Sequence, residues 1–120
     1  MNPNVYASSV QKDITLFEKE NVVIVGINTG NDEIFYYEMT ELKSLCEACN
    51  YEVCETIIQN LKNANSATYV GTGKVDEIKR IALSIDAKKV IFNDELTPAQ
   101  IKNLSEGIGD EIEVMDRTML

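Results

Sequence analysis

Histidine is absent from the 120-residue sequence, and this absence removes a large part of enzyme side-chain chemistry. A Ser–His–Asp triad and a Cys–His pair both need the imidazole, because it is the base that activates the nucleophile. The carboxylate pair Asp94-Glu95 remains a candidate for acid–base catalysis, but an acidic turn before a helix is the commoner role of such a pair. We therefore expect no catalytic residues in this chain.

Cysteine is scarce as well, with only Cys46, Cys49 and Cys54. A sparse, odd-numbered set does not build a disulfide framework, which favours a reducing compartment. The C-x₂-C-x₄-C spacing offers three ligands, whereas a closed structural zinc site needs four. We expect the three side chains to pack in the core and to bind no metal, with redox sensing as the alternative.

Long apolar runs are also missing, since none approaches the roughly 18–20 residues that cross a bilayer. The first thirteen residues lack the basic start and the apolar centre of a signal peptide. With 44% hydrophobic and 26% charged residues, the composition is that of one ordinary globular domain. We expect a cytoplasmic protein with no membrane partner.

Positive charge is in short supply, because the net charge is −9. Its distribution is uneven: residues 62–89 hold six lysine or arginine residues and three acidic ones, a net charge of +3, so the remaining segments carry −12. Contacts to phosphate groups, where they occur, are expected in this basic segment. The alternative is that these cations form only the solvated face of a helix.

What is present is a regular alternation of apolar runs and helical patterns. Short strands that alternate with helices predict right-handed crossovers and an open four-stranded parallel sheet with helices on both faces. We expect the flavodoxin-like strand order 2-1-3-4, because it places the most continuous apolar run inside the sheet. The expected strands are 21–28, 52–60, 89–93 and 111–115, and the expected helices are 39–49, about 74–85, and one from the cap Thr97 to Gly107 and Gly109.

Capping signals refine these helices. Thr40 is the expected cap of the first helix, whose buried face would hold Leu42, Leu45, Cys46 and Cys49. Phe35-Tyr36-Tyr37 is expected as a hydrophobic lead-in to this helix, with an exposed partner surface as the alternative. The second helix would have Asp76-Glu77 in its first turn. Thr97 and Gln100 form the pattern of a capping box, with Pro98 at the first helical position.

Residues 1–21 form a polar, weakly patterned extension ahead of the first strand. Their pattern allows either a helix from Ser9 to Glu18 or a loosely packed segment. The domain itself is expected to span 22–120.

The stretch TYVGTGKV, residues 68–75, resembles a nucleotide-binding loop at first sight. A P-loop anchored on Gly73-Lys74 would need a glycine where Thr68 stands and a hydroxyl where Val75 stands. The dinucleotide pattern G-x-G-x-x-G fails too, because Asp76 occupies its third glycine position. We therefore expect no mononucleotide at this loop, although the carboxyl edge of a parallel sheet is where ligands usually bind.

Four blocks, residues 41–62, 67–79, 89–109 and 114–120, resemble the N-terminal domain of HflX-type GTPases in order and spacing. The resemblance covers 22–120 and implies a ribosome-associated protein whose N-terminal domain docks on the ribosomal RNA of the large subunit and influences its own GTPase domain in ribosome splitting or rescue. The family continues into a helical linker and a GTP-binding domain, so we expect this chain to be an excised N-terminal domain. GTP and Mg²⁺ would belong to the absent domain, and no cofactor is expected here.

The resemblance also implies that the glycine loop serves RNA or interdomain contact. The two glycines would adopt positive φ or let the backbone approach a phosphate, Lys74 would supply charge, and Tyr69 would stack on a base or sugar. The alternatives are a tight turn with Tyr69 in the core and, for the whole chain, a stand-alone nucleotide or small-ligand binding module. The candidate contact residues are Lys62, Asn63, Thr68, Tyr69, Gly71, Thr72, Gly73 and Lys74.

Overall fold

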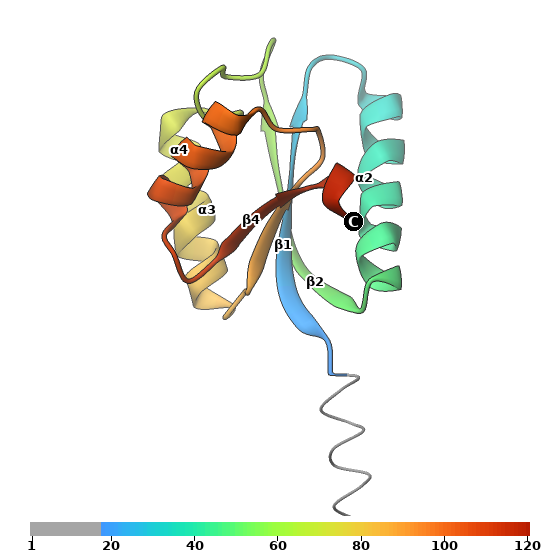
Figure 1. The fold of residues 1–120 in the computed structure, drawn as a ribbon. Coiled ribbons are helices and arrows are strands. Elements are labelled where there is room, and N and C mark those ends of the chain that lie inside the picture. The colour runs from blue at the N-terminus through green and yellow to red at the C-terminus, as the bar shows by residue number, and fades with distance from the viewer. Residues whose placement is uncertain (1–17) are drawn as a thin grey trace, which may run out of the picture.

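A computed structural model describes residues 18–120, in which a parallel sheet lies between α2 on one face and α3 and α4 on the other (Figure 1). The helix expected from Ser9 to Glu18 lies outside the described residues, except for its last residue. The elements are β1 (Glu20–Asn28), α2 (Asp32–Ala48), β2 (Tyr51–Asn60), α3 (Thr72–Ser84), β3 (Lys89–Phe92), α4 (Pro98–Ile108), β4 (Glu113–Asp116) and the 3₁₀ helix η1 (Arg117–Met119).

The sheet has the order β2-β1-β3-β4 with every neighbouring pair parallel, which confirms the predicted topology. The cause is the run from Val22 to Ile27, in which every residue is buried. A strand that is apolar on both faces is most stable in the interior of a sheet covered on both sides. β2 is left at one edge and the short β4 at the other.

Alternate residues of β1 supply two separate cores. Val23, Val25 and Ile27 face the layer of α3 and α4, where Ile78 and Leu104 are fully buried. Val22 and Ile24 face α2 and contribute to a second cluster with its buried residues, which are Phe35, Met39, Leu42 and Cys46. The alternation follows from the two-residue period of a strand.

The first helix starts earlier than predicted. Its cap is Asn31, whose side-chain oxygen accepts a hydrogen bond from the amide of Ile34 at 3.2 Å. Thr40 is therefore no cap: it lies inside α2, where its hydroxyl donates to the carbonyl of Tyr36 at 2.9 Å. The expected lead-in, Phe35-Tyr36-Tyr37, is part of the helix, and only Phe35 among these three is buried.

The other helix boundaries differ by smaller amounts. α3 begins at Thr72, so Asp76-Glu77 fall beyond its first turn, which contains no acid. The capping box of α4 is confirmed: Thr97 Oγ1 accepts from the Gln100 amide at 3.1 Å, and Gln100 Oε1 accepts from the Thr97 amide at 2.9 Å. Gly107 lies within α4, and β4 starts at Glu113, later than predicted.

The prediction that the cysteines pack in the core is right for one of the three. Cys46 is buried, and burial followed by repulsion from neighbouring negative charge raises the pKa of its thiol to about 11. Cys49 follows the end of α2 and Cys54 lies in the edge strand, so both are exposed, as is the expected core residue Leu45. All three thiols are free, and residues 18–120 contain no cluster of side chains suited to a metal ion.

No helix in the described part of the chain combines the length and the apolar character needed to cross a membrane.

Candidate functional site

The loops that follow β1, β2 and β3 meet at the carboxyl edge of the sheet, because parallel strands all end on the same side. They enclose a hollow of about 420 Å³. Its polar lining includes Asn31 at the start of α2, Glu38 two turns further on, Lys62 and Asn63 after β2, and Asp94 after β3. Two predicted contact residues, Lys62 and Asn63, are thus brought together with acids from two other elements.

The loop from β2 to α3 is held in place by Asn65. Its side-chain oxygen accepts from the amides of Ala67 and Thr68 at 2.8 and 3.1 Å, and its backbone forms two hydrogen bonds with that of Tyr69. α4 adds a further tie, since Gln100 Nε2 donates to the Asn65 carbonyl at 2.9 Å. Short asparagine side chains stabilise turns in this way, so the loop has a defined conformation.

Tyr69 belongs to the core. Its side chain is only 2% exposed, its ring packs edge-on against Phe92 with 5.5 Å between centroids, and its hydroxyl donates a short hydrogen bond to the Asp94 carboxylate. Burial, followed by the contact with Asp94, raises the pKa of Tyr69 far above its usual value. Stacking of this ring on a base is therefore not available, and the alternative reading of Tyr69 as a core residue is the correct one.

The glycines of the loop do not need positive φ. Gly71 caps α3 with φ −61°, and among the loop residues the left-handed conformation belongs instead to Tyr69, at φ 65°. The amide of Gly71 donates to Gln59 Oε1 at 2.9 Å, and a Cβ on Gly71 would stand 3.2 Å from Gln59 Nε2. A Cβ on Gly73 would meet nothing within 4 Å. The lack of a side chain at position 71 is thus explained by the close approach of the Gln59 side chain from β2.

The basic segment divides into paired and unpaired cations. Lys74 Nζ lies 2.7 Å from Glu77 Oε2, and its side chain is only 21% exposed. Lys88 pairs with Asp86, and Lys89 with Glu20 and Glu113. Within residues 18–120, ion pairs involve none of the three remaining cations of this segment, the exposed Lys62, Lys79 and Arg80.

The candidate contact residues include Lys74 but not Lys79 and Arg80, which belong to the same basic segment and are exposed without an ion pair in residues 18–120. The sequence already indicated that Lys74 would be paired, because a lysine and a glutamate three residues apart on a helix, here Lys74 and Glu77, commonly form an ion pair. Of the other predicted residues, Thr68 donates a hydrogen bond from its hydroxyl to the carbonyl of Val70 at 2.7 Å. Thr72 and Gly73 are exposed at the start of α3.

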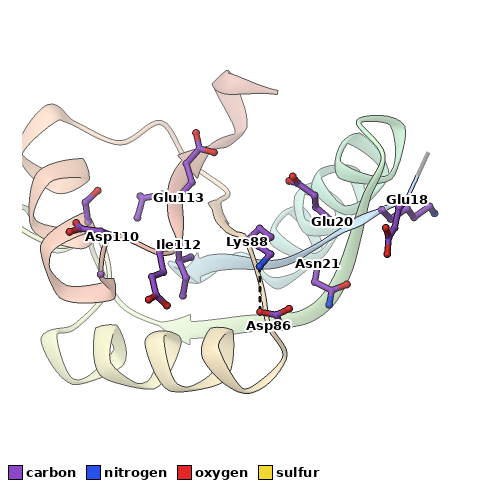
Figure 2. A pocket seen from close by; sticks show the side chains of 13 residues that line it. Glu18, Glu20, Asn21, Asp86, Lys88, Asp110, Ile112 and Glu113 are labelled. Carbon is purple, nitrogen blue, oxygen red and sulfur yellow. Dashed lines mark hydrogen bonds and ion pairs between the residues drawn. The ribbon is translucent and has the colours of Figure 1, made fainter. Parts of the chain in front are cut away.

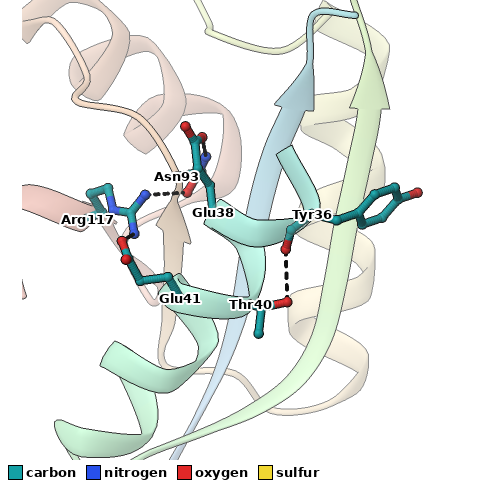
Figure 3. Close-up of polar contacts among 6 residues, drawn as sticks. All are labelled: Tyr36, Glu38, Thr40, Glu41, Asn93 and Arg117. Carbon is teal, nitrogen blue, oxygen red and sulfur yellow. Dashed lines mark hydrogen bonds and ion pairs between the residues drawn. The ribbon is translucent and has the colours of Figure 1, made fainter. Parts of the chain in front are cut away.

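A hydrogen-bond network next to the hollow joins three elements (Figure 3). Arg117 donates to Asn93 Oδ1 at 3.1 Å and to Glu41 Oε1 at 2.7 Å, and Asn93 Nδ2 donates to Glu38 Oε2 at 3.0 Å. The end of β4 is in this way connected to α2 through the buried Asn93. The sequence offered one cue to this network, an asparagine directly after a buried strand.

A second hollow, of about 760 Å³, lies at the amino edge of the sheet (Figure 2). Its charged lining is mostly acidic, with Lys19 and the ion-paired Lys88 as its basic members. The acidic side chains are Glu18, Glu20, Asp86, Asp110, Glu111 and Glu113. Although larger, this hollow is unsuited to phosphate-bearing ligands, because like charges repel.

Comparison with known proteins supports the resemblance. Residues 36–120 match the family described as "GTP-binding GTPase N-terminal". The GTPase HflX of Alkalihalophilus pseudofirmus is 40% identical over 110 residues, and that of Flavobacterium psychrophilum 36% over 113, which is 91% and 92% of this chain. The GTPase HflX of Lacrimispora saccharolytica is 35% identical over 85% of the chain.

These matches cover only part of each relative. They account for 26%, 26% and 24% of the three proteins, so the chain spans about a quarter of the length of the curated relatives it matches. The matching region is their N-terminal one. The chain therefore belongs to the GTP-binding GTPase N-terminal family, and it is a domain of the kind found at the N-terminus of HflX-type GTPases.

Proposed function

We propose that this chain is the ribosome-docking and regulatory domain of an HflX-type GTPase. Family membership is the observation that carries this proposal, since the matched relatives are named GTPase HflX. The domain would bind ribosomal RNA of the large subunit and modulate its own GTPase domain during ribosome splitting or rescue. GTP and Mg²⁺ would be bound by that other domain, in the cytoplasm.

The distribution of charge supports RNA binding at the side of the molecule that holds α3 and the loop before it. α3 carries three cations and two acids, and Lys79 and Arg80 on it are exposed and unpaired within the described residues. Lys62 adds a further exposed cation at the carboxyl edge. α2, on the opposite face of the sheet, carries five acids and one lysine, so it would repel a phosphate backbone. Docking would therefore use α3 and the loop before it.

A second candidate function has its own supporting observation. The hollow at the carboxyl edge brings Lys62 together with Glu38 and Asp94, so it offers both charges to a small polar ligand. A stand-alone binding module would use this hollow and would need neither a ribosome nor a GTPase domain.

The experiment measures binding of the full-length GTPase to isolated large subunits at several salt concentrations. Each phosphate contact to single-stranded RNA contributes a log–log salt slope of about −0.7. Lys62→Ala, Lys79→Ala and Arg80→Ala should each weaken binding and flatten the slope by somewhat under one unit, without changing RNA preference. Lys74→Ala should have a smaller effect, because Lys74 is paired with Glu77.

Lys43→Ala is the matched control, because Lys43 is likewise an exposed lysine, but on α2. Its affinity and salt slope should equal those of the wild type. Unchanged affinities for all the α3 and loop variants would refute docking through this side of the domain.

A further inference from the structure

Exposed apolar side chains are concentrated on two elements, α2 and η1. Within residues 18–120, six large hydrophobic residues are exposed, and five of them belong to α2 or η1, the sixth being Leu83 of α3. The five are Ile34, Tyr36, Tyr37, Leu45 and Met119. Tyr37 is the most exposed, at 70%. Apolar side chains concentrated on one exposed part of a soluble domain mark a contact surface, and tyrosine is enriched in protein interfaces.

Helical geometry places three of these residues on one stripe. Ile34, Tyr37 and Leu45 follow the spacing i, i+3, i+11, which corresponds to one face of a helix. Tyr36 points away from the side where Glu41 and Arg117 meet (Figure 3). We name the stripe of Ile34, Tyr37 and Leu45, together with Met119 of η1, the α2 outer face.

The chemistry of α2 identifies the class of partner. Five carboxylates and a single lysine on this helix exclude an RNA backbone by repulsion. An apolar stripe within an acidic surface suits a protein partner with an apolar contact and a basic rim.

The position of the C-terminus indicates which protein this partner is. Leu120 packs on the cluster beneath α2, and Arg117 is tied to Glu41 of α2, so the C-terminus lies beside this helix (Figure 1). The matched relatives are about three and a half times the length of this chain. A polypeptide that continues past Leu120 would emerge next to the α2 outer face, and a tethered partner binds at high effective concentration.

We propose that the α2 outer face is the docking surface for the part of the GTPase polypeptide that follows Leu120. The inference rests on the proposed function only in taking this chain as one domain of a longer GTPase. RNA contact and domain contact would then occupy opposite faces of the sheet, α3 for the first and α2 for the second.

The test is the rate of maleimide labelling at single cysteines, followed by mass spectrometry of the peptide that contains them. Cys49→Ser and Cys54→Ser first remove the two exposed thiols, while Cys46 is buried. Tyr37→Cys and Leu45→Cys report on the α2 outer face, and Leu83→Cys on α3 is the matched control. Each variant is labelled in the 120-residue chain and in the full-length GTPase.

We expect labelling at Tyr37→Cys and Leu45→Cys to be at least tenfold slower in the full-length GTPase than in the 120-residue chain. Leu83→Cys should react equally fast in both. Thermal unfolding of each variant checks that it is folded. Both reporter positions are exposed, so if one substitution impairs folding, the other variant still tests the inference.

Equal rates in the two proteins would overturn the inference. Labelling that slows with concentration in the 120-residue chain would point to a second copy, and labelling that slows only when large subunits are added would point to the ribosome; each also overturns it. Failure of ribosome binding alongside tenfold protection would leave the inference standing and would remove only the ribosome-docking proposal.

Discussion

Tyr69 adopts a backbone conformation that non-glycine residues rarely take, and its side chain shows what stabilises it. The φ of 65° is maintained by the backbone pairing with Asn65, by the edge-on contact with Phe92 and by the hydrogen bond to Asp94. Asp94 therefore has a structural role as the acceptor for a buried hydroxyl. Two residues that invited functional readings, an aromatic in a glycine loop and a carboxylate at a strand end, are explained by each other.

The raised pKa of Tyr69 predicts a loss of stability at alkaline pH. Below the ordinary tyrosine pKa of 10.0 both folded and unfolded states hold the proton. Above it the unfolded state releases the proton while the folded state keeps it, so the free energy of unfolding falls as pH rises above about 10. Tyr69→Phe should flatten this decline and, by removing a hydrogen bond, lower stability near neutral pH by about 1 kcal/mol.

Urea denaturation at a series of pH values measures this effect. Tyr37→Phe is the matched control, since it removes a hydroxyl from an exposed tyrosine outside the core. A Tyr69→Phe profile as steep as that of the wild type would contradict the assignment of the alkaline instability to Tyr69.

The helix starts show how packing chooses between two plausible caps. Asn31 and Thr40 both precede residues that can form a helix, and Phe35-Tyr36-Tyr37 between them is the segment expected from the sequence to be a hydrophobic lead-in. Burial of Phe35 against the sheet decides in favour of Asn31, because an earlier start adds that residue to the core. α4 offered no such competition, since Thr97, Pro98 and Gln100 agree on one start.

A pair of threonine substitutions tests both helix starts. Thr97→Ala removes a capping hydroxyl and should lower the free energy of unfolding by about 1 kcal/mol. Thr40→Ala lies within α2 and should be neutral or stabilising by a few tenths of a kcal/mol, because alanine has the higher helix propensity. The shift in urea midpoint at constant slope gives both values. A larger loss for Thr40→Ala than for Thr97→Ala would contradict the start of α2 at Asn31.

The whole molecule has two unlike sides separated by its sheet. The strand order places α2, with its acids and exposed apolar residues, on one face, and α3, with two cations that form no ion pair within residues 18–120, on the other. The loops at the carboxyl edge lie between them, with the hollow that contains Lys62. Under the two proposals, the nucleic acid and the protein would contact opposite sides of the domain and would not compete.

GTP binding tests whether the domain acts as a nucleotide module. The 120-residue chain should show no saturable binding of GTP at micromolar concentrations and should hydrolyse no GTP. The reason is that its loop lacks the first glycine and the Mg²⁺-binding hydroxyl of a P-loop. Calorimetric titration with GTP and Mg²⁺ provides the measurement, with the full-length GTPase as the positive control. Saturable binding that disappears in Lys74→Ala would reverse this prediction.

The sequence by itself determined the α/β class, the strand order, the capping box at Thr97 and the family. These depend on local patterns, namely the period of apolar residues, the cap residues beside a helix start, and the order of blocks along the chain. Only the tertiary structure decided which cations form ion pairs with distant residues, because the partner of a lysine such as Lys89 is Glu20, far away in the sequence. The same holds for Tyr69 with Asp94 and for Arg117 with Glu41, whose contacts exist only after the sheet has brought distant segments together.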